Sequence, residues 1–472
     1  MVTNTPSTVV GTAEDPLALY TMQHTEKFPA LNRVHAWQTQ SLTPTTAILL
    51  QASTAFLDAC RTTRHGLSIY TLPYFATITQ ERAALLARGL RRLMDREFDS
   101  STQHPMAFIE NVVEQHGDAR DQTALRFYVL SLHNNGGDRN VYHENPNVTL
   151  YWPRKIARSY LDRLTTPFAT AYSHHVRTTN SSLLNSTVIE KDIINAIVSG
   201  AYAWNTLTPP TEDRASINES TEWYTYQLLS GSSICLDWLL EEFIARLRTD
   251  RTTNPAHRLH GLTLPLQFLQ LEALASAGIL TATPGSSALT TPPSPMHTDT
   301  LDVTHLQRSD GSITRTAVRR YRLQHFLDNR PAFTENPERR GSFLIGVLVG
   351  QLSHHQQSSR NMQRTLRDQH HADTITPQSL TRLYHRLIDT AGMYATDVDW
   401  AGQLLFPETV DALTDTLSTI NPTDWTLSHP DLQFFYALGV SYGLRTDRHT
   451  TELIETTRST ATTDHPNASP EP

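Results

Sequence analysis

Hydrophobic residues recur at helical spacing along most of this 472-residue chain. The firmest cases are "ERAALLARGLRRLMDREF" in residues 46–100, which we expect to be helical, and "WLLEEFIARLR" and "LPLQFLQLEALASAGIL" in residues 152–280. The most apolar run covers residues 343–352 and is followed at once by Ser353-His354-His355. A membrane-crossing helix needs ~20 apolar residues, about twice the length of this run. We therefore predict that it is a helix buried in the protein core.

One segment instead has the alternation of a β-strand. In residues 125–130, Leu, Phe and Val alternate with Arg, Tyr and Leu, and the turn residues Asn134-Asn135-Gly136-Gly137 follow. Asparagine and glycine tolerate the positive φ angles of tight hairpin turns. We predict a β-hairpin whose second strand lies near Val141. Asn134 and Asn135 at its tip would contact a nucleic acid, unless the segment is simply a turn.

The composition changes between residues 281 and 300, where "TATPGSSALTTPPSPMHTDT" is rich in Pro, Ser and Thr. Such a segment is typical of a linker between domains. We predict an α+β protein with five parts: an irregular start (1–45), a mixed α+β domain (46–280), the linker (281–300), a helical bundle domain (301–445) and a disordered tail (446–472).

Two helical segments of the C-terminal part carry glycines four residues apart. Gly346 and Gly350 lie in the apolar run, and Gly439 and Gly443 lie in "DLQFFYALGVSYGLR". Glycine within a helix costs ~1 kcal/mol relative to alanine, so a pair on one face indicates close contact between backbones. We predict that the two helices cross at their glycine faces and close the bundle. The alternative is that the glycines are merely tolerated.

The charges are unusual in kind and in distribution. Lysine occurs only at Lys27, Lys155 and Lys191, so arginine supplies 36 of the 39 basic residues. The net charge is −8, yet residues 315–386 carry +7 and residues 387–472 carry −10. Arginine presents a planar fork of donors that matches phosphate, although a GC-rich genome would produce the same preference.

Three groups of arginines in the basic part have helical spacing, and we expect each group to share one helix face. Such a face suits a nucleic-acid phosphate backbone, which contributes affinity without reading the base sequence. The alternative is a solvated helix surface. The candidate residues are Arg315, Arg319 and Arg322; Arg360, Arg364 and Arg367; and Arg382 and Arg386.

No catalytic motif is evident in the sequence. There is no phosphate-binding GxxxxGK[ST] loop and no HExxH, and Cys60 and Cys235 cannot form a four-cysteine zinc site. His354-His355 and His370-His371 favour a polar surface, since adjacent helical side chains point about 100° apart. We expect no catalytic residue, metal or cofactor. With no basic start or apolar run that would indicate a signal peptide, we expect a cytoplasmic protein.

Three segments resemble a known family, in the order in which the family has them: "LRFYVLSLHNNGGDRNVYHENPNV", "RRGSFLIGVLVGQLSHHQ" and "DLQFFYALGVSYGLR". Together they resemble the large subunit of type I-B CRISPR interference (Cascade) complexes, over roughly residues 125–445. The first segment is a strand, turn and strand, and the other two are glycine-bearing helices of the C-terminal part.

The resemblance implies a subunit that is not an enzyme. It would help recognise the DNA that flanks a target, and would help hold the guide RNA and the displaced strand through its arginines. The implied partners are guide RNA, target DNA, the backbone and small subunits of the complex, and a helicase-nuclease effector. Members often carry a cysteine-rich zinc-binding element, which two cysteines cannot build. An internal start at Met296 would produce a separate small subunit.

Two other classes of protein remain open from the residues alone. One is a nucleic-acid-binding regulator or scaffold outside CRISPR systems, and the other is an enzyme whose site has no recognisable motif. A regulator would bind duplex DNA by itself. An enzyme would have a polar pocket with perturbed titratable groups.

Overall fold

The computed structural model divides into two compact units. The first comprises Met1–Arg154, Lys191–Tyr202 and Pro210–Gly231, and the second comprises Lys155–Glu190, Ala203–Pro209 and Ser232–Pro472. The structure describes residues 9, 42–64, 67–95, 104–135, 138–166, 168–169, 172, 182–185, 187–207, 219–253, 263–282, 289, 301–310, 312–396, 404–420 and 425–463.

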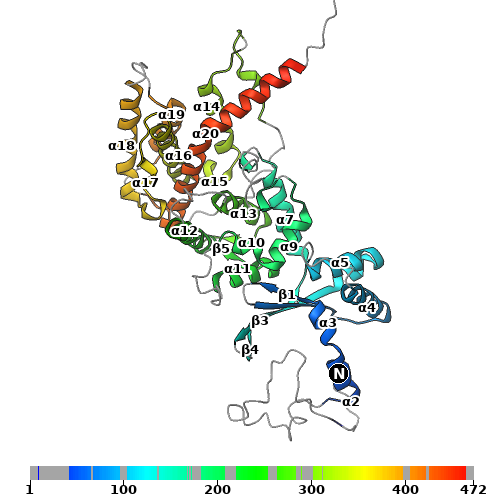
Figure 1. Ribbon diagram of the computed structural model, residues 1–472. Helices are drawn as coiled ribbons and strands as arrows, with labels where there is room; N and C mark the ends of the chain where they lie inside the picture. Colours follow the sequence, from blue (N-terminus) through cyan, green and yellow to red (C-terminus); the bar gives the residue numbers. More distant parts are fainter. Residues whose placement is uncertain are drawn as a thin grey trace, which may run out of the picture. The chain divides into compact units, whose positions relative to one another are not determined.

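The first unit is built on an antiparallel sheet with the strand order β1-β2-β3-β4, shown in the lower part of Figure 1. Helices α4 and α5 pack on each other and against β2, α3 packs against α4, and α11 packs against β4. The elements are α2 (Pro44–Ala52), α3 (Thr54–Ala59), β1 (Arg61–Arg64), β2 (Leu67–Phe75), α4 (Gln80–Met94), α5 (Pro105–His116), α6 (Ala119–Ala124), β3 (Leu125–Asn135), β4 (Asp138–Val148), α9 (Glu190–Ser199) and α11 (Glu219–Ser230).

The predicted hairpin is present as β3 and β4, whose register ends with Asn135 opposite Asp138. Leu125, Phe127 and Val129 are buried, whereas the residues between them are half-buried, as the alternation predicts. The backbones of Asn134 and Asn135 belong to β3, and their side chains lie outside the described residues.

The expectation of helix throughout residues 46–100 is wrong, because β1 and β2 lie within that range. β2 is an almost continuously buried strand, "LSIYTLPYF", paired along its whole length with β3. A short apolar run of this kind does not distinguish a central strand from a buried helix. The pairing with β3, at least fifty residues away along the chain, decides in favour of a strand.

The described residues of the second unit are mainly helical, as predicted for the C-terminal part. Helices α7 (Tyr151–Leu164) and α10 (Ala201–Trp204) cross the division between the units, and the first residue of α9, Glu190, also belongs to the second unit. The other elements are η4 (Ser182–Leu184), β5 (Ile234–Cys235), α12 (Leu236–Thr253), α13 (Thr263–Ala277), β6 (Leu280–Thr281), η5 (Thr304–Leu306), α14 (Arg315–Asp328), α15 (Pro331–Thr334), α16 (Pro337–Ser358), α17 (Leu366–Gln369), η6 (Ala372–Thr374), α18 (Pro377–Thr396), α19 (Pro407–Ser418) and α20 (His429–Thr463).

The apolar run lies in α16, and residues 341–353 of this helix are all buried. Among the described residues, no helix is long and apolar enough to cross a membrane. Of the predicted linker, the structure describes residues 281, 282 and 289, so the domain boundary there stays a prediction. Met296 lies outside the described residues.

Helices α16 and α20 lie against each other (Figure 1), and the glycines of both helices are at the contact. A Cβ atom added to Gly346 would lie 2.2 Å from the carbonyl oxygen of Tyr436, and one added to Gly350 would lie 2.4 Å from that of Val440. In the other direction, a Cβ on Gly439 would lie 2.0 Å from the carbonyl oxygen of Phe343. Only glycine lets two helix backbones approach this closely.

The prediction of a disordered tail from residue 446 is wrong for residues 446–463, which continue α20 as a helix. Ile454 is buried and packs in one cluster with Val303 and Val318 of the neighbouring segments. The threonines of this stretch are compatible with a helix because their hydroxyls donate to carbonyls four residues earlier, as Thr450 does to Thr446 at 2.7 Å.

Candidate nucleic-acid interface

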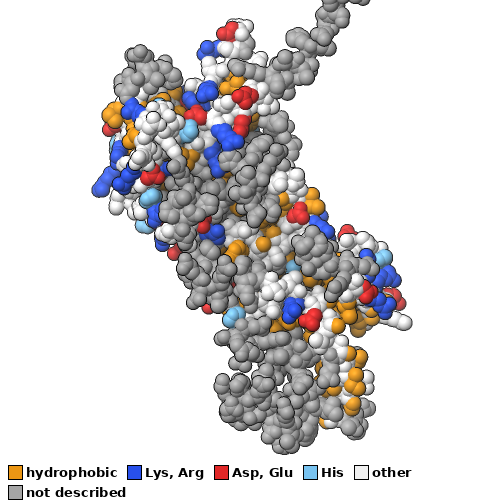
Figure 2. All heavy atoms as spheres, in the orientation of Figure 1, with side chains coloured by type: hydrophobic (Ala, Val, Ile, Leu, Met, Phe, Trp, Pro, Cys, Tyr) orange, Lys and Arg blue, Asp and Glu red, His pale blue; other side chains and the backbone are white. Residues whose placement is uncertain are grey.

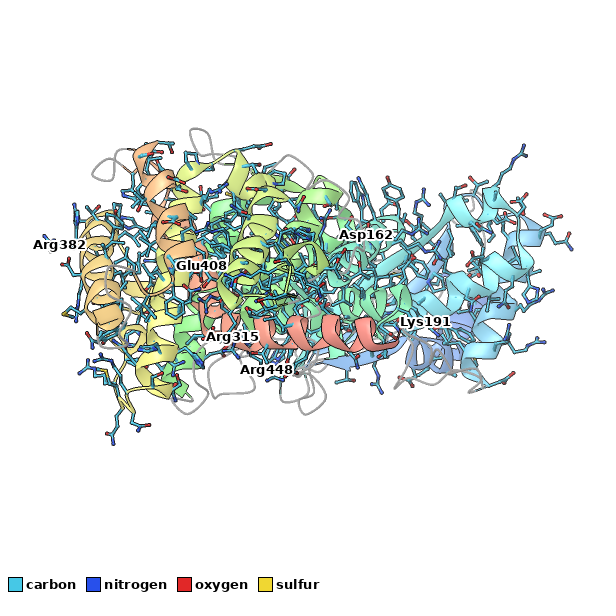
Figure 3. The ribbon with its side chains drawn as sticks, turned by 90° about the horizontal axis from the view of Figure 1, so that it is seen from above. Asp162, Lys191, Arg315, Arg382, Glu408 and Arg448 are labelled. Atoms are coloured by element: carbon cyan, nitrogen blue, oxygen red, sulfur yellow. The ribbon has the colours of Figure 1, made fainter. Side chains whose placement is uncertain are left out.

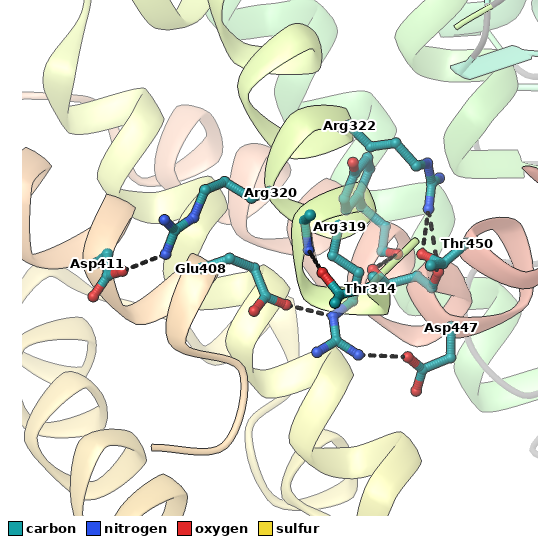
Figure 4. Close-up of polar contacts among 11 residues, drawn as sticks. Thr314, Arg319, Arg320, Arg322, Glu408, Asp411, Asp447 and Thr450 are labelled. Atoms are coloured by element: carbon teal, nitrogen blue, oxygen red, sulfur yellow. Dashed lines mark hydrogen bonds and ion pairs between the residues drawn. The ribbon is translucent and has the colours of Figure 1, made fainter. Parts of the chain in front are cut away.

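The first arginine group lies on α14, where the predicted shared face is turned into the bundle (Figure 4). Arg319 is 9% exposed and donates Nε to Glu408 at 2.6 Å and Nη1 to Asp447 at 3.1 Å. Arg322 is also buried and donates to the carbonyl oxygen of Thr446 at 3.1 Å. Helical spacing places residues on a common face, but it does not determine whether that face is exposed.

Only Arg315 of this group is exposed, and its Nη2 donates to Thr451 Oγ1 at 3.3 Å. Glu408 is buried, and this burial raises the pKa of its carboxyl group, while Arg319 acts in the opposite direction. Arg319 and Arg322 therefore hold α14 against α19 and α20. We do not carry these two residues into the proposed interface.

The basic residues 315–386 and the acidic residues 387–472 also form ion pairs with each other. In addition to the pairs of Arg319, Arg320 pairs with Asp411 at 2.7 Å. The buried Arg339 of α16 pairs with the buried Asp431 of α20 at 2.6 Å. Ion pairs within the second unit therefore neutralise much of the opposite charge of the two segments.

The second arginine group does not lie on one helix, so its predicted common face is wrong. Helix α16 ends at Ser358, Asn361 has a left-handed φ of 50°, and α17 begins at Leu366. Thr365 and Asp368 form a capping box that starts α17. This Thr-x-x-Asp pattern was the sequence signal for a new helix between Arg364 and Arg367.

The three arginines of this group have different surroundings. The Arg360 guanidinium lies 4.0 Å from the centre of the Tyr394 ring. Arg367 is half-buried, with Nε 3.6 Å from Asp368 Oδ1. Arg364 is exposed.

The third group has the predicted arrangement. Arg382 and Arg386 lie one turn apart on α18 and are both exposed. Figure 3 shows Arg382 on the outer side of α18. Arg386 reaches α17, where Nη2 donates to Gln369 Oε1 at 3.0 Å. We call Arg364, Arg382 and Arg386 the C-terminal arginine surface.

Two further arginines lie beside this surface and were not among the sequence candidates. Arg248 and Arg251 of α12, here called the α12 arginines, both approach Asp373 of η6. Arg251 Nη2 lies 2.9 Å and Arg248 Nε 3.5 Å from Asp373 Oδ2. The run "RLRTDRTT" showed the basic residues, but their neighbours come from a part of the chain more than a hundred residues away.

The histidines near this surface do not form a metal site in the described part of the chain, where no cluster of three or more His, Cys, Asp or Glu side chains could hold a metal ion. Figure 2 shows basic and histidine side chains next to one another near the position of α17. Burial lowers the pKa of His355, His370 and His371 below the ordinary value, so these imidazoles are neutral at neutral pH.

Comparison with known proteins gives the family. The chain is 30% identical over 461 residues to the CRISPR-associated protein Cas8b of Haloferax volcanii, an alignment that covers 94% of this chain. The chain is a homologue of Cas8b. The alignment covers 62% of the length of that relative. Residues 223–452 also match the family described as the C-terminal domain of CRISPR-associated protein TM1802.

The resemblance to the large subunit of type I-B Cascade complexes is therefore confirmed for this Cas8b homologue. The matched C-terminal domain includes α12 and the helices from α14 to α19, so it contains both the α12 arginines and the C-terminal arginine surface.

Proposed function

We propose that this Cas8b homologue is the non-catalytic large subunit of an RNA-guided antiviral surveillance complex. The observation that carries the proposal is the similarity to Cas8b over 94% of the chain. Its partners would be a guide RNA, target DNA, the backbone and small subunits of the complex, and a helicase-nuclease effector. In such a complex, base pairing reads the target sequence, while protein contacts read the flanking motif and hold the backbone.

Within this role, the C-terminal arginine surface would bind phosphates of the guide RNA or of the displaced DNA strand. Its arginines are exposed and come from two separate segments, the turn before α17 and helix α18. A positively charged surface of this kind follows a single strand without reading its bases. Recognition of the DNA that flanks the target would fall to the first unit, where Asn134 and Asn135 at the hairpin tip are the candidates.

A tagged pull-down from the native host tests the assignment to a complex. We expect short RNAs of one common length that end in repeat-derived sequence, together with the other subunits identified by mass spectrometry. Recovery of the protein without RNA or CRISPR-associated partners would overturn the proposal.

The contribution of the surface can be measured separately with a fluorescent single-stranded oligonucleotide and the full chain. The double variant Arg382→Gln with Arg386→Gln should weaken binding and reduce the slope of log K against log salt by ~0.7 for each phosphate that the protein no longer neutralises. Arg448→Gln is the matched control. Arg448 is 53% exposed on its side chain, pairs with Glu452 on the same helix, and loses the same charge. Equal binding by wild type and both variants would exclude this surface.

A further inference from the structure

Two adjacent histidines, His370 and His371, lie between α17 and η6, where arginines from several segments converge. We call them the histidine pair. Arg386 Nη1 lies 3.4 Å from His370 Nε2. Because a guanidinium only donates hydrogen bonds, His370 accepts this one and is neutral. Burial lowers the pKa of His370, and Arg386 and His371 lower it further.

His371 is held neutral by a second set of groups. Burial is the largest cause of its lowered pKa, and Arg251 and Arg364 lower it further. The carboxylates of Asp373 and Asp368 act in the opposite direction, more weakly than the burial and Arg251. His371 Nδ1 is buried and has no hydrogen-bond partner among the described residues. A proton on this nitrogen would therefore find no acceptor in the protein as it stands.

The remaining neighbours of the pair do not supply the missing negative charge. The Tyr436 hydroxyl donates to the carbonyl oxygen of His370 at 3.0 Å, and burial raises the pKa of Tyr436, so this side chain stays neutral. Gln433 donates to the carbonyl oxygen of Asp373 at 3.3 Å. Asp368 pairs with Arg367 and forms the capping box with Thr365 at the start of α17.

The result is an excess of positive charge around two neutral imidazoles. Asp373, with a side chain only 13% exposed, is shared between the two α12 arginines. The side chain of Arg248 is 57% exposed, and Arg364 and Arg386 are also exposed. Guanidinium groups that are held near one another and open to solvent suit an anion with several oxygens. Arg382, one helical turn from Arg386, extends the same surface beyond the reach of a single phosphate.

We propose that the α12 arginines extend the C-terminal arginine surface into one binding site for the phosphodiester backbone of a single-stranded nucleic acid, and that the histidine pair takes up protons when the strand binds. The proposal rests on the proposed function, because it assumes that this surface holds a strand. The phosphates would bind the guanidinium groups, and their negative charge would stabilise the imidazolium forms of the histidine pair. A phosphodiester does not titrate near neutral pH, so any pH dependence of binding belongs to the protein.

The sign of the pH dependence follows from the surroundings. In the free protein, burial and the arginines disfavour the imidazolium forms. A bound phosphate offsets the arginine charge that disfavours the imidazolium forms, so it raises the proton affinity of the histidine pair. Binding must then strengthen as the pH falls, by up to about tenfold per pH unit for each proton taken up.

The extension onto α12 is tested with oligothymidylate and oligouridylate of equal length, which separate a DNA strand from an RNA strand. We expect Arg248→Gln with Arg251→Gln to weaken binding at least about threefold and to lower the salt slope. Arg448→Gln should bind as wild type does, and thermal melts of all variants verify folding. If the α12 double variant binds normally while the Arg382→Gln, Arg386→Gln variant is weakened, the extension is wrong and the proposed function stands.

Proton uptake is measured by calorimetry in two buffers of different ionisation enthalpy and by affinity at pH 6 and pH 8. Wild type should take up protons and bind severalfold tighter at pH 6. His370→Gln with His371→Gln should lose most of this difference, whereas His116→Gln, on an exposed position of α5, should keep it. The absence of proton uptake in wild type, or a full pH effect in the double variant, would overturn the role of the histidine pair.

Discussion

The crossing of α16 and α20 leads to a sharp prediction for Gly439→Ala. The added Cβ would lie 2.0 Å from the carbonyl oxygen of Phe343 and 2.9 Å from the backbone nitrogen of Val347. Both are backbone atoms and cannot rotate away as a side chain can. The two helices would have to separate by at least about 1 Å to reach the shortest tolerated Cβ distance of 3.0 Å.

The expected loss in the free energy of unfolding is the cost of overpacking minus the gain from replacing glycine by alanine. Overpacking a well-packed contact costs roughly 1–3 kcal/mol, and a clash with backbone belongs at the upper end. Replacing glycine by alanine within a helix returns ~1 kcal/mol. We therefore expect a loss of about 2 kcal/mol in the free energy of unfolding. For a unit of this size, that lowers the melting temperature by roughly 4–8 °C.

The assay is thermal unfolding followed by circular dichroism, with Gly392→Ala as the matched control. Gly392 lies in α18 of the same unit, and its added Cβ would meet only Leu404 Cδ2 within 4 Å, at an ordinary 3.6 Å. The control should keep or slightly raise the melting temperature. Equal melting temperatures for the two variants would refute the backbone contact as the reason for the glycines.

Three further predictions concern buried groups. Arg339→Met should cost ~3–5 kcal/mol because it leaves the Asp431 carboxylate buried without its partner, and a second change, Asp431→Leu, should restore most of the loss in urea unfolding. Burial raises the pKa of the Cys60 thiol to about 12, so iodoacetamide at pH 8 should alkylate the half-buried Cys235 first. Equal alkylation rates of the two cysteines in the native protein would contradict the burial of Cys60. Ile454→Asp should release the end of α20 from its hydrophobic cluster, so limited proteolysis should cut the variant after residue 446. An unchanged digestion pattern would show that this packing does not hold the helix.

The candidate site was only partly predictable. Arg382 and Arg386 have the exposure and the shared face that their spacing suggested, because α18 is an amphipathic helix with one side in solvent. The spacing of the α14 arginines was equally regular, yet Arg319 and Arg322 are buried against acidic and polar groups of α19 and α20. Sequence periodicity identifies a face, and only the neighbouring helices determine what that face contacts.

By itself, the sequence determined the features that depend on neighbouring residues. Alternation and a two-glycine turn specified the β3–β4 hairpin, and a glycine every four residues in an apolar helix specified a close helix contact. Tertiary structure decided the features that depend on distant partners. β2 is a strand because β3 pairs with it, and residues 446–463 are helical because Ile454 has a cluster to join. The α12 arginines pair with Asp373 because η6 lies beside α12. Local patterns fix backbone preference and amphipathic faces, whereas burial and charge pairing depend on contacts between segments that lie far apart in the chain.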